Sequence, residues 1–388
     1  MKTFKLILFL IVSFLFTQAA LAQAPNQPRA DDIHDVLQTH QWEKVDASVE
    51  RGLAWLAEQQ QADGSFEAID YAQPAVTSFC LMAFLAQGEN LNDGKYKEQL
   101  SKALDFIILQ QKPNGLIATS APTVAPIPRT GNFFDVGMPC VYNHAISSMV
   151  LAEAYGQCSD EQTKKLKPVI EKAIAATLEM QRWKKAKKDE TGGWRYLNPR
   201  PSGDSDLSLT GWQLMFLRSA KNAGFDVPKE SIDAAVEFVE RCFLKDRKHF
   251  GYLVGNNSRC TRAMLGTGVL ALAHAGHQDS EKAIASGDLI LKNNFKKYNE
   301  GQLYANSPEP DRYHYGMFLC TQAMYHLGGK YWKQFFPPVV DALLANQEKD
   351  GGWPSEKQGW RPIGRCYSTS LCILALSVPN QMLPIFQR

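Results

Sequence analysis

Two patterns of hydrophobic and polar residues alternate along this chain. In the first, apolar residues recur every three or four positions and leave a charged face, as over residues 100–108. In the second, apolar residues occupy nearly every position, as over 79–85, 268–273 and 371–376. A helix of the first kind has one side in water, whereas a helix of the second kind must be enclosed by protein. The alternation predicts outer amphipathic helices paired with inner buried ones.

A short turn joins the two kinds of helix and repeats along the chain. It reads Gln, then a Gly-containing turn, often with an aromatic residue, as at 59–66 and 347–353. The turn glycines are Gly64, Gly115, Gly193, Gly251, Gly301 and Gly352, in steps of 51, 78, 58, 50 and 51 residues. A nearly constant period indicates one helix–turn–helix unit copied and stacked. Six units without a strand pattern predict an all-α fold, an (α/α)6 toroid with six outer and six inner helices.

The N-terminus has the features of a signal peptide. Lys2 and Lys5 precede an apolar run over 6–16, and 20–22 offers small residues for cleavage. The run is too short to remain as a membrane span, so we expect a secreted or periplasmic protein cleaved near Ala22 with no transmembrane segment in the mature chain. The predicted segments are a signal peptide at 1–22, an N-terminal extension at 23–44, a toroid at 45–380 and a tail at 381–388.

Charge and cysteine usage narrow the classes of partner and site. Removal of Lys2 and Lys5 from 42 basic residues leaves 40, against 40 acidic residues. This neutral balance gives no basis for binding nucleic acid or an anionic membrane. The eight cysteines contain no CxxC pair, and Cys80, Cys320 and Cys372 lie in apolar runs, which predicts buried thiols. No thioester sequence, nucleophile elbow or phosphate-cradling loop occurs, and no cofactor is expected.

Two stretches interrupt the repeat, at 116–140 and 182–206. Loops of this length inside a compact domain often act as lids or binding segments. The alternative is a tolerated insertion at the surface. We interpret the lysine run within 182–188 in the second way.

The Gln…Gly-Gly-Trp repeat, with two helices in each of six units, resembles the prenyltransferase and squalene-cyclase repeat superfamily. The resemblance covers about residues 45–380 and is nearest to secreted bacterial proteins of this repeat type. It implies an α/α toroid. Toroids of this superfamily serve as terpene cyclases, prenyltransferase subunits, thioester domains and vitamin carriers, so the fold does not select an activity.

The segment 204–208, Asp-Ser-Asp-Leu-Ser, resembles the Asp-x-Asp-Asp-Thr segment of class II terpene cyclases. In that family the middle Asp protonates an alkene or epoxide, and the resemblance gives this role to Asp206, with Asp204 beside it. Leu207 stands where the family has its last Asp. The alternative role for Asp206 is a helix N-cap, because Asp favours that position.

Aromatic and polar residues near the predicted starts of inner helices are candidates to line a central cavity. They are Trp194, Tyr196, Trp212, His144, Tyr315, Trp353, Arg365 and Tyr367. Aromatic faces stabilise a carbocation, which is the use a cyclase makes of them. The alternative is packing within the toroid.

A second resemblance concerns metal. Residues 311–314 are similar to the Asp-x-Tyr-His segment of protein prenyltransferase β subunits, whose His binds zinc, which would be His314. Cys260 matches the Cys of their Asp-x-Cys segment, but Ser258 replaces its Asp. Two ligands do not make a zinc site, so we predict no metal and interpret Cys260 and His314 as a buried thiol and a hydrogen-bonded imidazole.

Two functions follow as hypotheses. In the first, the protein binds a small apolar or isoprenoid molecule, or an envelope protein partner, at the mouth of the inner ring. In the second, it is a class II terpene-cyclase-like enzyme, an intramolecular transferase with Asp206 as Brønsted acid. The enzyme requires Asp206 to face a closed, aromatic-lined apolar cavity.

Overall fold

The computed structural model describes residues 33–120, 139–197, 203–255, 259–301, 311–357 and 362–387. The predicted signal peptide, most of the first long insertion and Ser258 lie outside these ranges. Their predicted roles therefore stay predictions.

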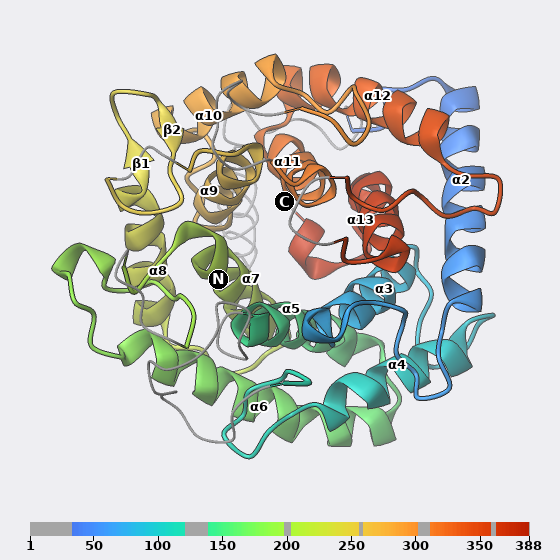
Figure 1. The fold of residues 1–388 in the computed structure, drawn as a ribbon, viewed down its shortest axis with the longest axis horizontal. Coiled ribbons are helices and arrows are strands. Elements are labelled where there is room, and N and C mark those ends of the chain that lie inside the picture. The colour runs from blue at the N-terminus through green and yellow to red at the C-terminus, as the bar shows by residue number, and fades with distance from the viewer. Residues whose placement is uncertain are drawn as a thin grey trace, which may run out of the picture.

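Long helices alternate between two concentric rings (Figure 1). The outer helices of the described chain are α2 (Thr39–Glu58), α4 (Lys97–Leu109), α6 (Asp160–Arg182), α8 (Lys229–Arg241), α10 (Glu281–Lys292) and α12 (Gly329–Asn346). The inner helices are α3 (Ala75–Leu85), α5 (Pro139–Ala154), α7 (Leu207–Asn222), α9 (Arg262–His274), α11 (Tyr313–Leu327) and α13 (Arg365–Ser377). The last inner helix α13 packs on α3, and α12 contacts α2, so the rings are closed. The predicted (α/α)6 toroid is confirmed.

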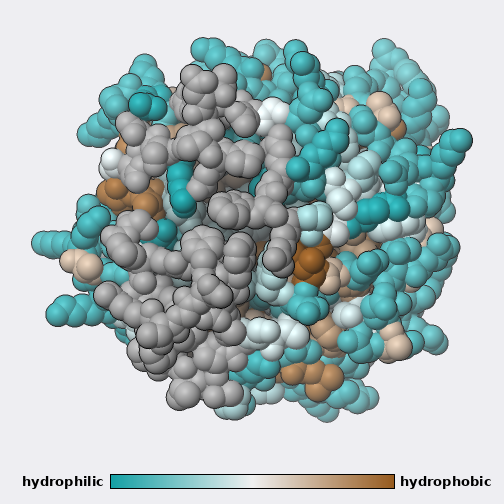
Figure 2. Space-filling model, viewed as in Figure 1, coloured by the Kyte–Doolittle hydropathy of each residue, from teal (hydrophilic) through white to brown (hydrophobic). Residues whose placement is uncertain are grey.

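Burial follows the two sequence patterns. Every residue of α3, over 75–85, is buried, as a helix without a polar face requires. The outer helix α8 instead buries only a stripe, made of Ile232, Ala235, Val236, Phe238 and Val239. The space-filling view agrees, because hydrophilic residues cover most of the described rim (Figure 2).

In four of the described turns the repeated Gln fastens the turn to the next unit. Gln60 Nε2 donates to the carbonyl of Gly64 at 3.1 Å and to that of Gln99, in α4, at 2.8 Å. Gln111, Gln181 and Gln347 make the corresponding pair of bonds, and their outer-helix acceptors are the carbonyls of Val169, Ser231 and Ser48. The bond from Gln347 to Ser48, at 2.8 Å, joins the sixth unit to the first and closes the ring.

The first glycine of each of these four turns is required by the same contact. In the two Gly-Gly turns it is Gly192 and Gly351, not Gly193 and Gly352, on which the period was counted. Gly351 has φ +99°, and a Cβ there would lie 2.5 Å from the carbonyl oxygen of Arg51. Gly64 has φ +90°, and its Cβ would lie 2.3 Å from the carbonyl oxygen of Lys102. Only glycine combines this backbone with such a close approach. In these four turns the repeat in the sequence therefore marks the contact between neighbouring outer helices.

Short elements complete the described fold. Strand β1 (Phe243–Leu244) pairs antiparallel with β2 (His249–Phe250), a hairpin that the sequence pattern did not predict. The 3-10 turns are η2 (Asp70–Ala72), η3 (Tyr155–Gln157), η4 (Lys188–Glu190), η5 (Val378–Asn380) and η6 (Pro384–Phe386). Within the ranges given above, no helix joins enough length to enough apolar character to span a bilayer.

The C-terminal segment covers one end of the inner ring. Ile385 and Phe386 are buried, and Ile385 donates its N–H to Glu153 Oε2 at the end of α5, at 3.2 Å. The Phe386 ring lies 6.4 Å from that of Phe318 in α11. The predicted tail is thus part of the packed structure. The opposite end, where α5, α7 and α11 begin, is called the mouth below.

The eight cysteines are free thiols. Cys80, Cys320 and Cys372 are fully buried in inner helices, as their apolar surroundings predicted.

Candidate functional site

Asp206 caps the helix that follows it. Its backbone is extended, with φ −138° and ψ 156°, and its Oδ1 accepts the N–H of Leu209 at 2.8 Å. Its own N–H donates to the carbonyl of Trp194 at 2.9 Å, which fixes the loop before α7. The N-cap role raised from the sequence is therefore present.

The second carboxylate oxygen of Asp206 makes different contacts. The Tyr252 hydroxyl donates to Oδ2 at 2.9 Å, and Arg195 Nε lies 3.4 Å from the same atom. The side chain is fully buried. Burial raises the pKa of Asp206 to about 6, against the opposing effects of Arg195 and of hydrogen bonds from Leu209 and Tyr252. A carboxyl group with this pKa exchanges its proton near neutral pH, as general acid–base chemistry needs.

Tyrosine hydroxyls extend this network from the fourth unit back to the third. The Tyr196 and Tyr252 hydroxyls lie 2.8 Å apart. The guanidinium carbon of Arg195 lies 5.2 Å from the Tyr196 ring centre and 5.7 Å from that of Tyr252. The buried acid is thus bordered by two phenols and one fixed cation.

A second line of hydroxyls crosses the mouth between three inner helices. Tyr142 in α5 donates to Ser208 Oγ in α7 at 3.0 Å, and Ser208 Oγ lies 2.9 Å from the Tyr315 hydroxyl in α11. Trp212 Nε1 donates to the same Tyr315 oxygen at 2.9 Å. We call the following set the mouth cluster: Tyr142, Arg195, Tyr196, Asp206, Ser208, Tyr252 and Tyr315.

Aromatic rings fill the inner ring next to this line. Phe79 in α3 lies with its ring centre 5.6 Å from Trp212, 6.3 Å from Phe318 and 6.2 Å from Tyr367 in α13. Trp212 and Phe318 are stacked at 6.5 Å. Rings from four inner helices therefore meet across the centre. Among the described residues, side chains occupy this level of the toroid.

Trp194 and Trp353 have one shared structural role. Each backbone N–H donates to a threonine of the following inner helix, Thr210 at 3.1 Å and Thr369 at 2.9 Å. Each indole N–H reaches a carbonyl of the preceding outer helix, at Thr177 and Leu343. Both indoles therefore pack between the rings.

His144 also faces the space between the rings. It is fully buried, its Nδ1 accepts the N–H of Ile117 at 3.2 Å, and its Nε2 lies 2.9 Å from Thr177 Oγ1 in α6. Burial lowers the pKa of His144 to about 3, so the imidazole stays neutral.

Arg365 lies at the turn between the sixth and first units. Its two terminal nitrogens each bond an oxygen of Asp350 at 2.8 Å, and its guanidinium carbon lies 4.6 Å from the centre of the Trp55 ring. These contacts hold Arg365 at the outer turn, whereas Tyr315, Trp212 and Tyr367 point into the inner ring.

The two residues considered for metal binding have other surroundings. His314 is buried, with Nε2 2.8 Å from the Tyr298 hydroxyl and Nδ1 3.5 Å from Glu356 Oε1. Cys260 is buried in the segment before α9. Of the residues that the structure describes, no three or more His, Cys, Asp or Glu side chains are grouped to hold a metal ion.

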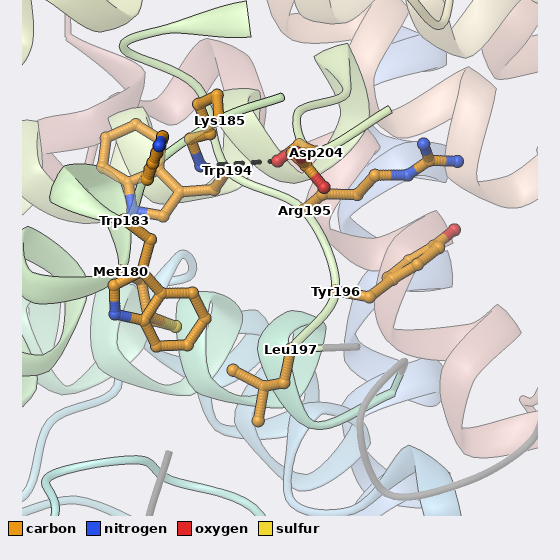
Figure 3. Close-up of a pocket in the computed structure, with 9 residues that line it drawn as sticks. Met180, Trp183, Lys185, Trp194, Arg195, Tyr196, Leu197 and Asp204 are labelled. Carbon is orange, nitrogen blue, oxygen red and sulfur yellow. Dashed lines mark hydrogen bonds between the residues drawn. The ribbon is translucent and has the colours of Figure 1, made fainter. Parts of the chain in front are cut away.

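Asp204 borders a small pocket beside the mouth cluster (Figure 3). The pocket has a volume of about 70 Å³ and is lined by Met180, Trp183, Lys184, Lys185, Trp194, Arg195, Tyr196, Leu197 and Asp204. The Asp204 carboxylate accepts the N–H of Ala186 at 2.8 Å, so it holds the loop that forms one wall. Figure 3 shows the side chains of Arg195 and Tyr196 extending away from Trp183 and Met180.

Sequence reasoning missed Tyr142, Arg195, Ser208 and Tyr252 as members of the site. Arg195 lies between two residues that were singled out, and Tyr252 belongs to a repeat turn at Phe250-Gly251-Tyr252. The sequence could therefore have indicated Arg195, as a charged residue between two aromatic residues of the repeat. It could not have indicated the contact between the third and fourth units that brings Tyr252 to Asp206.

Comparisons with known proteins give relatives of the fold alone. No family model and no curated protein matches the chain. A GH76 α-mannanase of Bacteroides thetaiotaomicron aligns over 87% of this chain and 95% of its own, with 13% identity and a TM-score of 0.58. A GH76 α-1,6-mannanase variant of Salegentibacter sp., solved with α-1,6-mannotriose, aligns over 87% and 99%, with 12% identity and a TM-score of 0.59.

A variant of the type II terpene cyclase MstE from Scytonema, in complex with geranylgeranyl dihydroxybenzoate, is similar to the same extent. It aligns over 89% of this chain and all of its own, with 13% identity and a TM-score of 0.57. Identities this low establish a common architecture and no activity. The chain shares its α/α-toroid fold with terpene cyclases and with α-mannanases alike.

Proposed function

We propose that this protein binds a small hydroxylated ligand with an apolar face, of the short-saccharide kind, at the mouth of the inner ring. The mouth cluster carries the proposal. It sets hydroxyl groups, one carboxyl and one guanidinium around aromatic rings contributed by several units. Sugars are recognised by this combination, because their hydroxyls need directional partners and their C–H faces pack on aromatic rings.

The depth of the site favours a short ligand. The contacts of Phe79 with Trp212, Phe318 and Tyr367 occupy the centre just inside the mouth. A long isoprenoid chain needs an open apolar cavity in that place. The apolar ligand expected from the sequence is therefore the weaker form of the binding hypothesis.

Asp206 is the group that can hold a mobile proton in this site. Its pKa of about 6 is the range of a general acid that protonates an oxygen atom, as in glycoside hydrolysis. Such hydrolysis also needs a second carboxyl group, and the Asp204 carboxylate is engaged with the N–H of Ala186. We therefore propose binding as the function and proton transfer by Asp206 as a property of the site.

Terpene cyclisation is the second candidate. The burial of Asp206 beside aromatic residues favours it, and a terpene cyclase is among the similar structures. Arg195 argues against it, because a cation 3.4 Å away stabilises the carboxylate and not the protonated acid. Leu207, in place of the last Asp of the resembling segment, points the same way.

A ligand panel tests the proposal. The mature protein is titrated with α-1,6-mannotriose, glucose, geranylgeraniol and squalene while binding is followed by calorimetry and by intrinsic tryptophan fluorescence. We expect saturable binding of a saccharide, weakened about tenfold or more in Tyr315→Phe and Ser208→Ala. Tyr331→Phe, on the outer helix α12, is the matched control and should bind as wild type does.

The other outcomes separate the alternatives. Binding of geranylgeraniol or squalene without saccharide binding, with a cyclised product that Asp206→Asn abolishes, would establish the cyclase. Binding of neither class would leave a protein partner, the remaining form of the hypothesis. Export through the predicted signal peptide is a separate proposal, which fractionation of producing cells tests.

A further inference from the structure

Lys185 differs from the lysines around it. The lysine run within 182–188 was interpreted as part of a tolerated surface insertion, and Lys184, Lys187 and Lys188 are exposed. Lys185 is half-buried and lines the pocket beside the mouth cluster. Its Nζ donates to the backbone carbonyl of Asp204 at 3.4 Å (Figure 3). Lys185 is therefore less exposed than the three lysines around it, a difference that the sequence did not indicate.

The carboxylates near this amine are bonded to other groups. Asp204 Oδ2 accepts the N–H of Ala186 at 2.8 Å. Glu190 Oε2 accepts the N–H of Asp204 at 2.8 Å, and its Oε1 lies 3.7 Å from Lys187 Nζ. Among the described residues, no carboxylate oxygen lies within 4.0 Å of Lys185 Nζ. The amine therefore has a carbonyl acceptor but no close counter-ion.

The cation on the same wall is also fixed. Arg195 Nε pairs with Asp206 Oδ2 at 3.4 Å, and its NH1 donates to the carbonyl of Gly203 at 2.8 Å. Lys184, at the adjacent position, also borders the pocket but is exposed. Thus the charged groups that face Lys185 are the carboxylates of Asp204, Glu190 and Asp206, which favour its charged form from a distance.

Removal from water outweighs those charges. Burial lowers the pKa of Lys185 to about 8. At pH 7 about a tenth of this amine is therefore unprotonated, whereas an exposed lysine is almost wholly charged. A desolvated lysine in a pocket with apolar walls is the usual form of a nucleophilic lysine.

We propose that Lys185 is a nucleophilic lysine that forms an imine with a small aldehyde or ketone entering this pocket. The nitrogen lone pair attacks the carbonyl carbon, and the C=O π electrons move to oxygen. A proton passes from nitrogen to that oxygen through solvent, which gives a carbinolamine. Water then leaves and a C=N bond remains. No oxidant or reductant takes part.

The pocket selects the carbonyl compound. A volume of about 70 Å³ admits only a small molecule, and the Trp183 and Met180 side chains offer apolar contacts. The backbone carbonyl of Asp204 accepts a hydrogen bond from Lys185 Nζ and so holds the amine at the pocket wall. This inference concerns a site beside the mouth cluster and does not depend on saccharide binding.

Reductive trapping tests the proposal. The folded mature protein is incubated with propanal and cyanoborohydride over pH 6 to 10, and peptide mass spectrometry measures propylation at each lysine. At pH 7 we expect Lys185 to be modified at least about tenfold faster than Lys184, with a half-maximal rate near pH 8. A bulky aromatic aldehyde should lose this preference for Lys185.

Variants separate reactivity from loop structure. Lys188→Arg, at an exposed lysine outside the pocket, should leave trapping at Lys185 unchanged. Lys185→Arg should remove the fast component while circular dichroism stays as in wild type. Trp183→Ala should let the bulky aldehyde react at Lys185. Modification of Lys185 at the same rate and with the same pH dependence as Lys184 would overturn the proposal.

Discussion

Asp206 and Arg195 form a buried ion pair in which Oδ2 and Nε are 3.4 Å apart. Both side chains are almost wholly excluded from solvent. Two opposing effects act on the pKa of Asp206. Burial raises it by favouring the neutral acid, and the Arg195 guanidinium lowers it by favouring the carboxylate. The result is a pKa of about 6 for an acid in the mouth cluster, and the predictions about the site follow from this value.

Asp206→Asn should remove one pH-dependent contribution to stability. The folded-state pKa of Asp206, about 6, lies above its ordinary value of 3.8. Its stabilising contribution is therefore complete below about pH 4 and is lost as the pH rises through about 6. Between pH 4 and 7.5 this loss amounts to about 2 kcal/mol of unfolding free energy, which the variant lacks.

Urea unfolding of both proteins at pH 4 and 7.5 measures this effect. The comparison uses the difference between the two proteins, because Glu153, with a pKa raised by burial to about 7, contributes equally to each. Equal pH dependence in wild type and variant would show that Asp206 does not titrate in this range.

Tyr252→Phe should raise the pKa of Asp206. The lost hydroxyl donates to Oδ2 at 2.9 Å and stabilises the charged carboxylate. Carbon NMR of the Asp206 carboxyl group across pH measures the change. Tyr196→Phe is the control, since the Tyr196 hydroxyl contacts Tyr252 at 2.8 Å, and its effect on the Asp206 pKa should be smaller. A larger shift of the Asp206 pKa in Tyr196→Phe than in Tyr252→Phe would contradict a direct hydrogen bond from Tyr252 to Asp206.

Asp311→Ala should destabilise the toroid by about 3 to 5 kcal/mol, because it leaves a buried guanidinium without its carboxylate. Arg262 Nε and Asp311 Oδ2 are 2.6 Å apart and both side chains are buried. Asp233→Ala removes an exposed pair with Lys229, also 2.6 Å long, and should change stability by less than about 1 kcal/mol. Urea unfolding measures both variants. Similar losses of unfolding free energy would mean that the buried pair contributes no more to stability than the exposed pair.

Gly351→Ala should open the seam between the sixth and first units. The new Cβ would lie 2.5 Å from the Arg51 carbonyl, in addition to the strain of φ +99°. Gly224 has a similar φ, +87°, but a Cβ there meets nothing within 4 Å. We expect a loss of roughly 1 kcal/mol for Gly224→Ala and roughly 2 to 4 kcal/mol for Gly351→Ala, measured by thermal unfolding. Equal losses of stability in the two variants would mean that the backbone of Arg51 moves aside without a measurable loss of stability.

The sequence by itself determined the toroid. The alternation of half-polar and wholly apolar helices dictates which helices are outer and which are inner, since a helix without a polar face cannot lie against water. The period also had a structural basis, because in four of the six turns the glutamine and a glycine make the contact between neighbouring units. Even Asp206 was found from its local sequence, as an N-cap and as a candidate acid.

Only the tertiary structure decided what surrounds that acid. Arg195 is 11 residues from Asp206 and Tyr252 is 46, and a ring of stacked units determines which of these side chains meet. The same packing turned His144, Trp353 and Arg365 toward the outer helices and buried Lys185 among exposed lysines. Helical periodicity specifies a face relative to the core, but partners across a closed ring depend on how every unit is placed against the next.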